Sequence, residues 1–210
     1  GRFRMKTIAL FPGQGSQYVG MGSALAAASP EAAELLGIAD DILGFSLSKL
    51  MAEGPEEELK ATLNTQPALF TTSMMSLTVL KKRGISFDYV AGHSLGEYSA
   101  ICAAGGFSFE EGLRLVRRRG ELMSQAGERR PGSMSAILGL EEELLTQLLD
   151  DASSAGIVVA ANFNCNGQIV ISGESAAVAR AGELALEKGA KKVVPLPVAG
   201  AFHSPLMEFA

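Results

Sequence analysis

The sequence predicts an α/β fold in two parts, and three observations support this prediction. Two short apolar segments, residues 7–11 and 87–91, are each followed by a loop that contains glycine. A helical segment lies between them, and this alternation is typical of a parallel sheet wound with helices. After residue 132 the pattern changes to short strands and helices of a different order. A chain of 210 residues is long enough for one large domain that carries a smaller insert.

The first part is predicted from apolar runs and helix signals. Its expected elements are strand 7–11, helix 67–83, strand 87–91, helix 94–104 and helix 108–125. Both strands are mostly apolar, which indicates buried parallel strands. Pro67 in a first turn and Gly84 just beyond a last turn are typical helix boundaries. Ser108 and Glu111 have the spacing of a capping box.

The second part is predicted to follow a linker at Ala126–Gly132, which is rich in charge, proline and glycine. Its expected elements are strand 133–138, helix 141–152, strand 157–163, strand 168–172, helix 176–188 and strand 191–196. Asn166-Gly167 between the middle strands is typical of a hairpin turn. The order β-α-β-β-α-β is the ferredoxin-like pattern. We therefore predict a large α/β subdomain over 1–126, an inserted small subdomain over 132–196, and a return to the large subdomain over 197–210.

The composition excludes several classes of protein. A formal net charge of −5 argues against a partner that is a nucleic acid or an acidic membrane surface. Cys102 and Cys165 lack metal-ligand spacing, so we expect no metal site and two free, buried thiols in a reducing compartment. The sequence has no apolar run of about 18 residues and no signal-peptide pattern. We therefore expect a cytoplasmic protein.

Ser94 is the candidate nucleophile. Gly92-His-Ser-Leu-Gly96 fits the G-x-S-x-G turn, with a predicted strand before it and a predicted helix after it. In this turn the glycines leave room where a Cβ would clash, and the helix start supplies unpaired N–H groups. The alternative is a tight turn in which Ser94 only caps the helix.

A serine hydroxyl needs a base to accept its proton, and the chain has two histidines. His93 is adjacent to Ser94, and neighbouring side chains at such a turn point apart, which favours a structural role. His203 follows the predicted insert, where the returning chain could bring it over the edge of the sheet. We predict that His203 is the base.

Acyl transfer also needs N–H groups directed at an oxyanion. Leu95, the residue after the nucleophile, is expected to supply one, and the Gly13-Gln14-Gly15 turn is suited to supply another from Gln14. The alternative is a plain glycine turn. The same loop lacks the Gly-Lys-Ser/Thr of a phosphate-binding loop, and Tyr18 occupies the place of the third dinucleotide-binding glycine.

Arg119 stands out on the helix that begins after Ser108. A step of about 100° per residue places it inside the apolar sector of that helix. A cation there needs an anionic or hydrogen-bonding partner. That partner could be a structural carboxylate such as Glu97 or Asp88, or the carboxylate of a substrate held by the guanidinium fork.

Five motifs together resemble a known family. They are Phe11-Pro-Gly-Gln-Gly-Ser-Gln17, Gln66-Pro67-Ala68, Gly92-His-Ser-Leu-Gly-Glu97, Arg119-Gly120 and Ala201-Phe-His-Ser-Pro-Leu-Met207. In order and approximate spacing they resemble the malonyl-CoA:acyl carrier protein transacylases of fatty-acid and polyketide synthesis. The resemblance runs from about residue 6 to the last residue, and it implies a hydrolase-like large subdomain with a ferredoxin-like insert.

The resemblance also implies roles for individual residues. Ser94 would take malonyl from malonyl-CoA and pass it to the phosphopantetheine thiol of acyl carrier protein, with His203 as base and then acid. Gln14 and Leu95 would form the oxyanion hole, and Arg119 would bind the malonyl carboxylate. The implied pocket residues are Gln66, Phe202 and His93. No metal or redox cofactor is implied, because coenzyme A is part of the substrate.

Members of this family continue beyond the histidine motif, whereas this chain ends seven residues after His203. We therefore expect that the C-terminal part of the large subdomain is missing and that this chain alone is inactive. Two alternatives stay open. One is a serine hydrolase or thioesterase of the α/β type, which normally uses an acidic residue to orient histidine. The other is an inactive docking fragment for acyl carrier protein.

Overall fold

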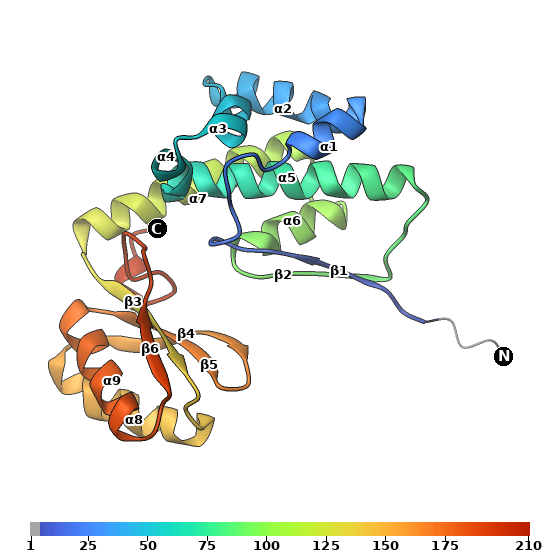
Figure 1. Cartoon of the computed structure of the whole chain (residues 1–210). Coiled ribbons are helices and arrows are strands. Elements are labelled where there is room, and N and C mark those ends of the chain that lie inside the picture. The colour runs from blue at the N-terminus through green and yellow to red at the C-terminus, as the bar shows by residue number, and fades with distance from the viewer. Residues whose placement is uncertain (1–4) are drawn as a thin grey trace. The chain divides into compact units, whose positions relative to one another are not determined.

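The computed structural model describes residues 5–210, and the chain divides into two compact units, Gly1–Glu121 and Leu122–Ala210 (Figure 1). The boundary falls inside one long helix, α7 (Phe109–Arg129). We call these the first and second units and describe each by itself. The sequence-based division at residues 126, 132 and 196 stays a prediction.

The first unit combines a two-stranded parallel sheet with several helices. Its elements are β1 (Ile8–Phe11), α1 (Ser23–Ala28), α2 (Pro30–Leu43), α3 (Leu47–Glu53), α4 (Glu56–Lys60), α5 (Thr62–Lys82), β2 (Tyr89–Gly92), α6 (Leu95–Ala103) and the first part of α7. Phe11 lies opposite Gly92 in the parallel register. Both strands therefore end at the same edge of the sheet, and the loops that follow them emerge together. The predicted α/β class with a parallel sheet is confirmed.

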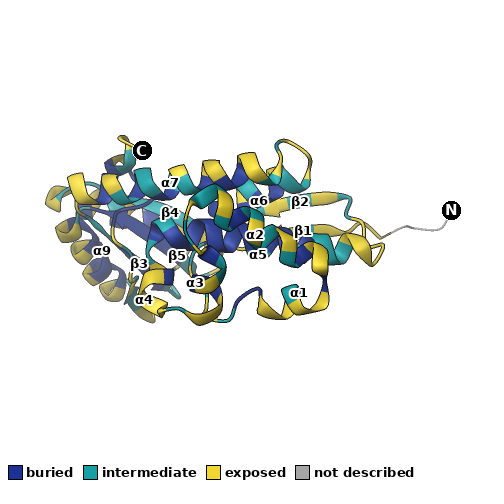
Figure 2. Ribbon diagram, turned by 90° about the horizontal axis from the view of Figure 1, so that it is seen from above, coloured by how far each residue is buried: buried dark blue, intermediate teal, exposed yellow. Residues whose placement is uncertain are grey.

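The sheet is much more exposed than the sequence predicts. On β1, alternate side chains point to opposite faces. Phe11 is buried and Ala9 packs against the core of the unit. Ile8 and Leu10 are 52% and 71% exposed. Figure 2 colours much of this sheet as exposed. The prediction that β1 and β2 are buried strands is therefore wrong, because among the described residues the core covers only one face of β1.

Helix α5 begins five residues before the predicted start, so Pro67 lies inside the helix instead of in its first turn. A proline in a helix lacks the N–H that would bond to the carbonyl four residues earlier, here Leu63. That carbonyl accepts a hydrogen bond from Arg117 Nη1 at 3.0 Å instead. A contact with a distant residue thus compensates for the proline, and no sequence-local rule could have predicted it.

Helix α7 confirms its predicted start and corrects its predicted end. The N–H of Ser108 donates to Glu111 Oε2 at 2.8 Å, and the N–H of Glu111 donates to Ser108 Oγ at 3.2 Å, which is the capping box. The helix continues to Arg129, through most of the predicted linker. Ala126 is fully buried within the second unit, so packing there extends the helix.

The second unit holds a four-stranded antiparallel sheet. Its elements are β3 (Ser133–Leu138), α8 (Leu145–Ala152), β4 (Val158–Cys165), β5 (Gln168–Gly173), α9 (Ser175–Glu187) and β6 (Lys192–Pro195), with short 3₁₀ turns at Glu142–Leu144, Ser153–Ala155 and Pro205–Met207. The strand order is β4-β5-β3-β6. The predicted order of elements, β-α-β-β-α-β, is confirmed.

Both faces of this sheet are covered within the second unit. Ile137 and Ile171 belong to a cluster with side chains of α8 and α9. Met134 points to the other face and belongs to a cluster with Met123 and Phe202. The sheet is therefore a central layer, with helices on one side and the segment around Phe202 on the other. None of the described helices is long and apolar enough to cross a membrane.

The two cysteines differ in exposure, which corrects the expectation that both are buried. Both are free; Cys102 is half-buried on α6, whereas Cys165 is exposed. Cys165 ends β4 next to the Asn166-Gly167 turn, where the hairpin extends past the core. Burial raises the pKa of the Cys102 thiol.

We expect iodoacetamide at pH 8 to modify Cys165 roughly tenfold faster than Cys102, since the thiolate is the reactive form and burial disfavours it. Intact mass with peptide mapping measures both rates. The Cys165→Ser variant should show only the slow reaction, and a fast reaction at Cys102 in that variant would contradict the described burial.

Candidate active site

Ser94 occupies a strained turn between β2 and α6. Its φ of 51° and ψ of −106° are rare for a residue with a Cβ, and such conformations cost about 1–3 kcal/mol. Among residues 5–210, Ser94 and His203 are the non-glycine residues with positive φ. The N–H of His93 donates to Phe11 O at 3.1 Å, which continues the sheet pairing into the turn. The predicted strand–turn–helix setting of Ser94 is present in the structure.

Close packing of glycines holds this turn against the loop after β1. A Cβ on Gly96 would overlap the carbonyl oxygen of Phe11, and a Cβ on Gly13 would lie 2.5 Å from the carbonyl oxygen of His93. Any larger residue at either place would force the loop and the turn apart. The glycines therefore bring Gln14 and Ser94 into one neighbourhood, as their positions in the sequence predict.

The hydroxyl of Ser94 does not cap the helix that follows it. Ser94 stands at the N-cap of α6, but its side chain makes no cap hydrogen bond. Instead, Ser94 Oγ accepts a hydrogen bond from Arg119 Nη2 at 3.0 Å. The alternative in which Ser94 only caps the helix is therefore wrong.

Arg119 joins three separate segments of the first unit. Its Nη1 donates to Gln66 Oε1 on α5 at 2.8 Å, and its Nη2 donates to Ser94. The guanidinium lies 5.5 Å from the centre of the Tyr98 ring on α6. Burial lowers the pKa of Arg119, while nearby Tyr98 and Glu97 oppose that shift. The hydrogen bonds described for this cation all go to neutral groups.

Asp88, one of the two carboxylates suggested as partners of Arg119, makes its described contacts with other residues. Its Oδ2 accepts a hydrogen bond from the N–H of Thr7 at 2.9 Å, and Lys6 Nζ lies 3.5 Å from its Oδ1. Asp88 therefore ties the start of β1 to the start of β2. Glu97, the other suggested carboxylate, acts on Arg119 through its charge, which opposes the lowering of the guanidinium pKa by burial.

The two expected oxyanion residues follow the two parallel strands. Gln14 lies in the turn after β1, and its Nε2 donates to Thr62 Oγ1 at 3.2 Å. Leu95 is the first residue of α6 and is 1% exposed. The first N–H groups of a helix have no partner within the helix. Both backbone N–H groups thus lie in the loops that the parallel register places together.

His203 belongs to the second unit, whereas Ser94 belongs to the first. His203 is exposed, has a φ of 58°, and lies between buried Phe202 and Ser204. Ser204 Oγ donates to the carbonyl oxygen of Ala201 at 2.6 Å, which holds the turn. The pairing of His203 with Ser94, like the pocket roles of Phe202 and exposed His93, stays a prediction.

Sequence reasoning missed two residues that contact the predicted site, Tyr98 and Thr62. Tyr98 lies four residues after Ser94, a spacing that places it on the same side of α6, so helical periodicity could have indicated it. Thr62 had no such signal, because its contact with Gln14 joins residues 48 positions apart.

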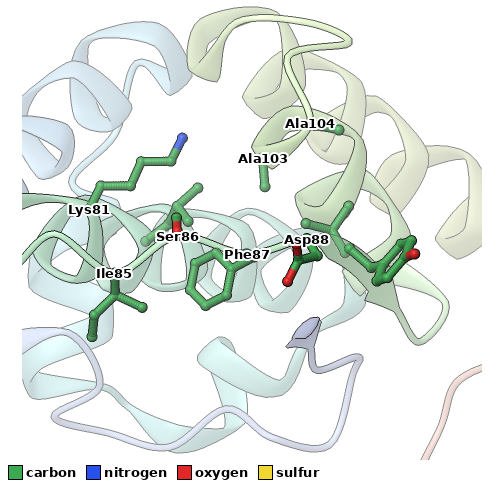
Figure 3. Close-up of a pocket in the computed structure, with 10 residues that line it drawn as sticks. Lys81, Ile85, Ser86, Phe87, Asp88, Ala103 and Ala104 are labelled. Carbon is green, nitrogen blue, oxygen red and sulfur yellow. The ribbon is translucent and has the colours of Figure 1, made fainter. Parts of the chain in front are cut away.

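A surface pocket of about 560 Å³ lies elsewhere in the first unit, beside the end of α5, β2 and α6 (Figure 3). Lys81, Phe87 and Asp88 are among its lining residues, and none of the predicted site residues lines it. Within residues 5–210, no cluster of three or more His, Cys, Asp or Glu side chains is arranged to hold a metal ion.

Comparison with known proteins establishes the family. Residues 9–210 match the family described as the acyl transferase domain. Because the match covers nearly the whole chain, the chain belongs to that family. It is 52% identical over 200 residues to the malonyl CoA-acyl carrier protein transacylase of Bacillus subtilis (strain 168). That alignment covers 95% of this chain and 63% of the relative, so the chain spans about two thirds of the relative's length.

Solved structures show the same fold. The crystal structure of an acyl-carrier-protein S-malonyltransferase from Burkholderia pseudomallei 1710b matches with a TM-score of 0.93 and 44% identity, over 98% of this chain and 67% of that one. A malonyl-transacylase solved in complex with its type II PKS acyl-carrier protein, PlMCAT:AntF, matches with a TM-score of 0.92 and 42% identity, over 97% of this chain and 66% of that one.

The strain at Ser94 predicts an unusual order of stability. Ser94→Gly and Ser94→Ala both remove the hydroxyl, but only glycine accepts a φ of 51° without strain. We expect Ser94→Gly to be more stable than Ser94→Ala by about 1 kcal/mol. Urea unfolding measures the difference.

Ser76 on α5 provides the matched control. In an ordinary helical conformation alanine is favoured over glycine by roughly 1 kcal/mol, so Ser76→Gly should be the less stable of that pair. If the alanine variant were more stable than the glycine variant at both positions, Ser94 would not be strained.

Proposed function

We propose that the protein carrying this chain transfers a malonyl group from malonyl-CoA to the phosphopantetheine thiol of acyl carrier protein, in fatty-acid or polyketide synthesis. The observation that carries this proposal is the 3.0 Å hydrogen bond between Arg119 and the hydroxyl of Ser94 on its strained turn. A nucleophile beside a half-buried cation suits an acyl group that bears a free carboxylate. The names of the relatives, a malonyl CoA-acyl carrier protein transacylase and an acyl-carrier-protein S-malonyltransferase, support the same reaction.

In the first half-reaction, Ser94 Oγ attacks the thioester carbonyl of malonyl-CoA while His203 accepts the hydroxyl proton. The N–H groups of Gln14 and Leu95 stabilise the oxyanion of the tetrahedral intermediate. The C–S bond then breaks, and His203 returns the proton to the leaving coenzyme A thiolate. A malonyl ester of Ser94 results.

In the second half-reaction, the phosphopantetheine thiol of the carrier protein attacks this ester, and His203 accepts the thiol proton. The ester bond breaks, and the proton passes to Ser94 Oγ, which restores the hydroxyl. Arg119 pairs with the malonyl carboxylate in both halves, and Gln66 keeps the guanidinium in place. Phe202 next to His203 limits the room for an α-methyl group. This scheme uses groups of the chain and its two substrates, with no further cofactor.

We also propose a finer division of the fold. Residues 132–196 form a ferredoxin-like subdomain inserted into a hydrolase-like large subdomain, to which residues 197–210 return. The β4-β5-β3-β6 order and the position of the elbow after a parallel strand support this division.

A first test follows the acyl group. Incubated with malonyl-CoA, the protein that carries this chain should gain one malonyl group by intact mass, and its Ser94→Ala variant should gain none because no other residue carries the ester. Added acyl carrier protein should take up the malonyl. Release of mostly free malonate in the presence of carrier would favour a hydrolase, and a persisting adduct on Ser94→Ala would remove that residue from its role.

A second test concerns the carboxylate. Arg119→Ala should slow loading of malonyl-CoA by about 100-fold, since a charge-assisted bidentate contact contributes about 3 kcal/mol. Acetyl-CoA has no free carboxylate, so its loading should change much less. Rates of ester formation with both substrates decide the matter, and equal losses would make Arg119 a structural residue.

A further inference from the structure

We infer that Thr62 is a positioning residue that sets the direction of the oxyanion loop, an inference that rests on the proposed function. Thr62 is the first residue of α5 and is 6% exposed. Its hydroxyl oxygen accepts the hydrogen bond from Gln14 Nε2 at 3.2 Å. The side chain of Gln14 thus bonds to the first residue of α5, while its backbone N–H is the group proposed to bind the oxyanion.

The loop that carries Gln14 needs such a tie. Gln14 has a glycine on each side, and glycine restricts the backbone less than any other residue. Gly15 has a φ of 107°, and its N–H bonds to Gln17 Oε1 at 2.8 Å, a contact within the loop itself. The bond from Gln14 to Thr62 instead connects the loop to a helix. Without it, the N–H of Gln14 would sample more orientations, and donors that are not preorganised stabilise an oxyanion less.

The start of α5 is firmly held and can serve as an anchor. Arg117 Nη1 donates both to the freed carbonyl of Leu63 and to Asn64 Oδ1, each at 3.0 Å. Asn64 Nδ2 in turn donates to the carbonyl of Glu58 at 3.0 Å. Arg117 also pairs with Glu121 at 3.0 Å. Helix α7 thereby fixes the turn on which Thr62 sits.

The same turn supports two functions that can be separated. Thr62 contacts the oxyanion loop, which acts on the carbonyl of any acyl group. Gln66, four residues later, holds Arg119, which acts only on an acyl group with a free carboxylate. A defect in the first contact should therefore affect all acyl substrates equally. A defect in the contact between Gln66 and Arg119 should slow only the transfer of malonyl.

The test is a pair of substitutions at one position. Thr62→Val keeps the shape and removes the acceptor, whereas Thr62→Ser keeps the hydroxyl. We expect Thr62→Val to lower kcat for serine acylation by roughly tenfold with malonyl-CoA and with acetyl-CoA alike, with KM little changed. Thr62→Ser should restore most of the rate.

Two further variants separate positioning from general damage. Gln14→Met removes the donor and keeps the backbone N–H, so it should reproduce the loss, and the double variant Thr62→Val/Gln14→Met should lose nothing more. Thr78→Val is the matched control, because the hydroxyl of Thr78 bonds to Met74 O within the same helix. It should leave the rate unchanged. Independent, additive losses at Thr62 and Gln14 would overturn the inference, as would a loss for malonyl without one for acetyl.

Hydrogen exchange supplies a readout that does not depend on activity. Amides of the peptide 11–18 should exchange faster in Thr62→Val than in the unsubstituted chain, and at the original rate in Thr62→Ser. Unchanged exchange in Thr62→Val would refute the positioning role even if malonyl transfer occurs. Failure of the protein that carries this chain to form any malonyl ester would refute the proposed function, while the exchange result would still decide whether Thr62 holds the loop.

Discussion

The parallel pairing of β1 with β2 is the constraint on which the candidate site depends. Because Phe11 lies opposite Gly92, the loops that follow the two strands begin at the same edge of the sheet. The N–H of His93 then bonds to Phe11 O, and no Cβ fits between Gly96 and that same carbonyl. These contacts hold Ser94 in a backbone conformation that it would not adopt alone. The strain is local, and the pairing and packing around it offset its cost.

The candidate site also contains a half-buried cation, Arg119. Arg119 is held by the amide oxygen of Gln66, the hydroxyl of Ser94 and the face of Tyr98, none of which carries a full charge. Burial lowers the pKa of this guanidinium. A cation in such a setting gains much by meeting a carboxylate, because the cost of removing it from water has already been met in the folded chain. The proposed preference for an anionic acyl group follows from this setting of Arg119 in the folded chain.

The sequence predicted those features that have local signals. The capping box of Ser108 and Glu111, the Asn166-Gly167 hairpin and the elbow around Ser94 all depend on residues within a few positions of one another. Arg119 was also predictable, because helical periodicity places it on an apolar face. Such patterns act within one element and do not need the tertiary fold.

The features that could not be predicted from the sequence depend on contacts between residues that are far apart along the chain. Helix α5 continues through Pro67 because Arg117, about fifty residues away, satisfies Leu63. Thr62 contacts Gln14 across a similar separation. The exposure of Ile8 and Leu10 also follows from which face the helices cover, and apolar composition alone does not reveal that.

Two of the arginines of α7, Arg117 and Arg119, together restrict rotation of the helix. Gly120 of this helix lies against the backbone of Leu63, and Arg117 and Arg119 leave the helix on opposite sides of that contact. One reaches Asn64 and the other reaches Gln66. Rolling α7 in either direction about its own axis would stretch one of these ties, so the pair resists torsion both ways. The direction of the Arg119 guanidinium is thereby fixed in the folded chain, and the proposed binding of a carboxylate would not require α7 to turn.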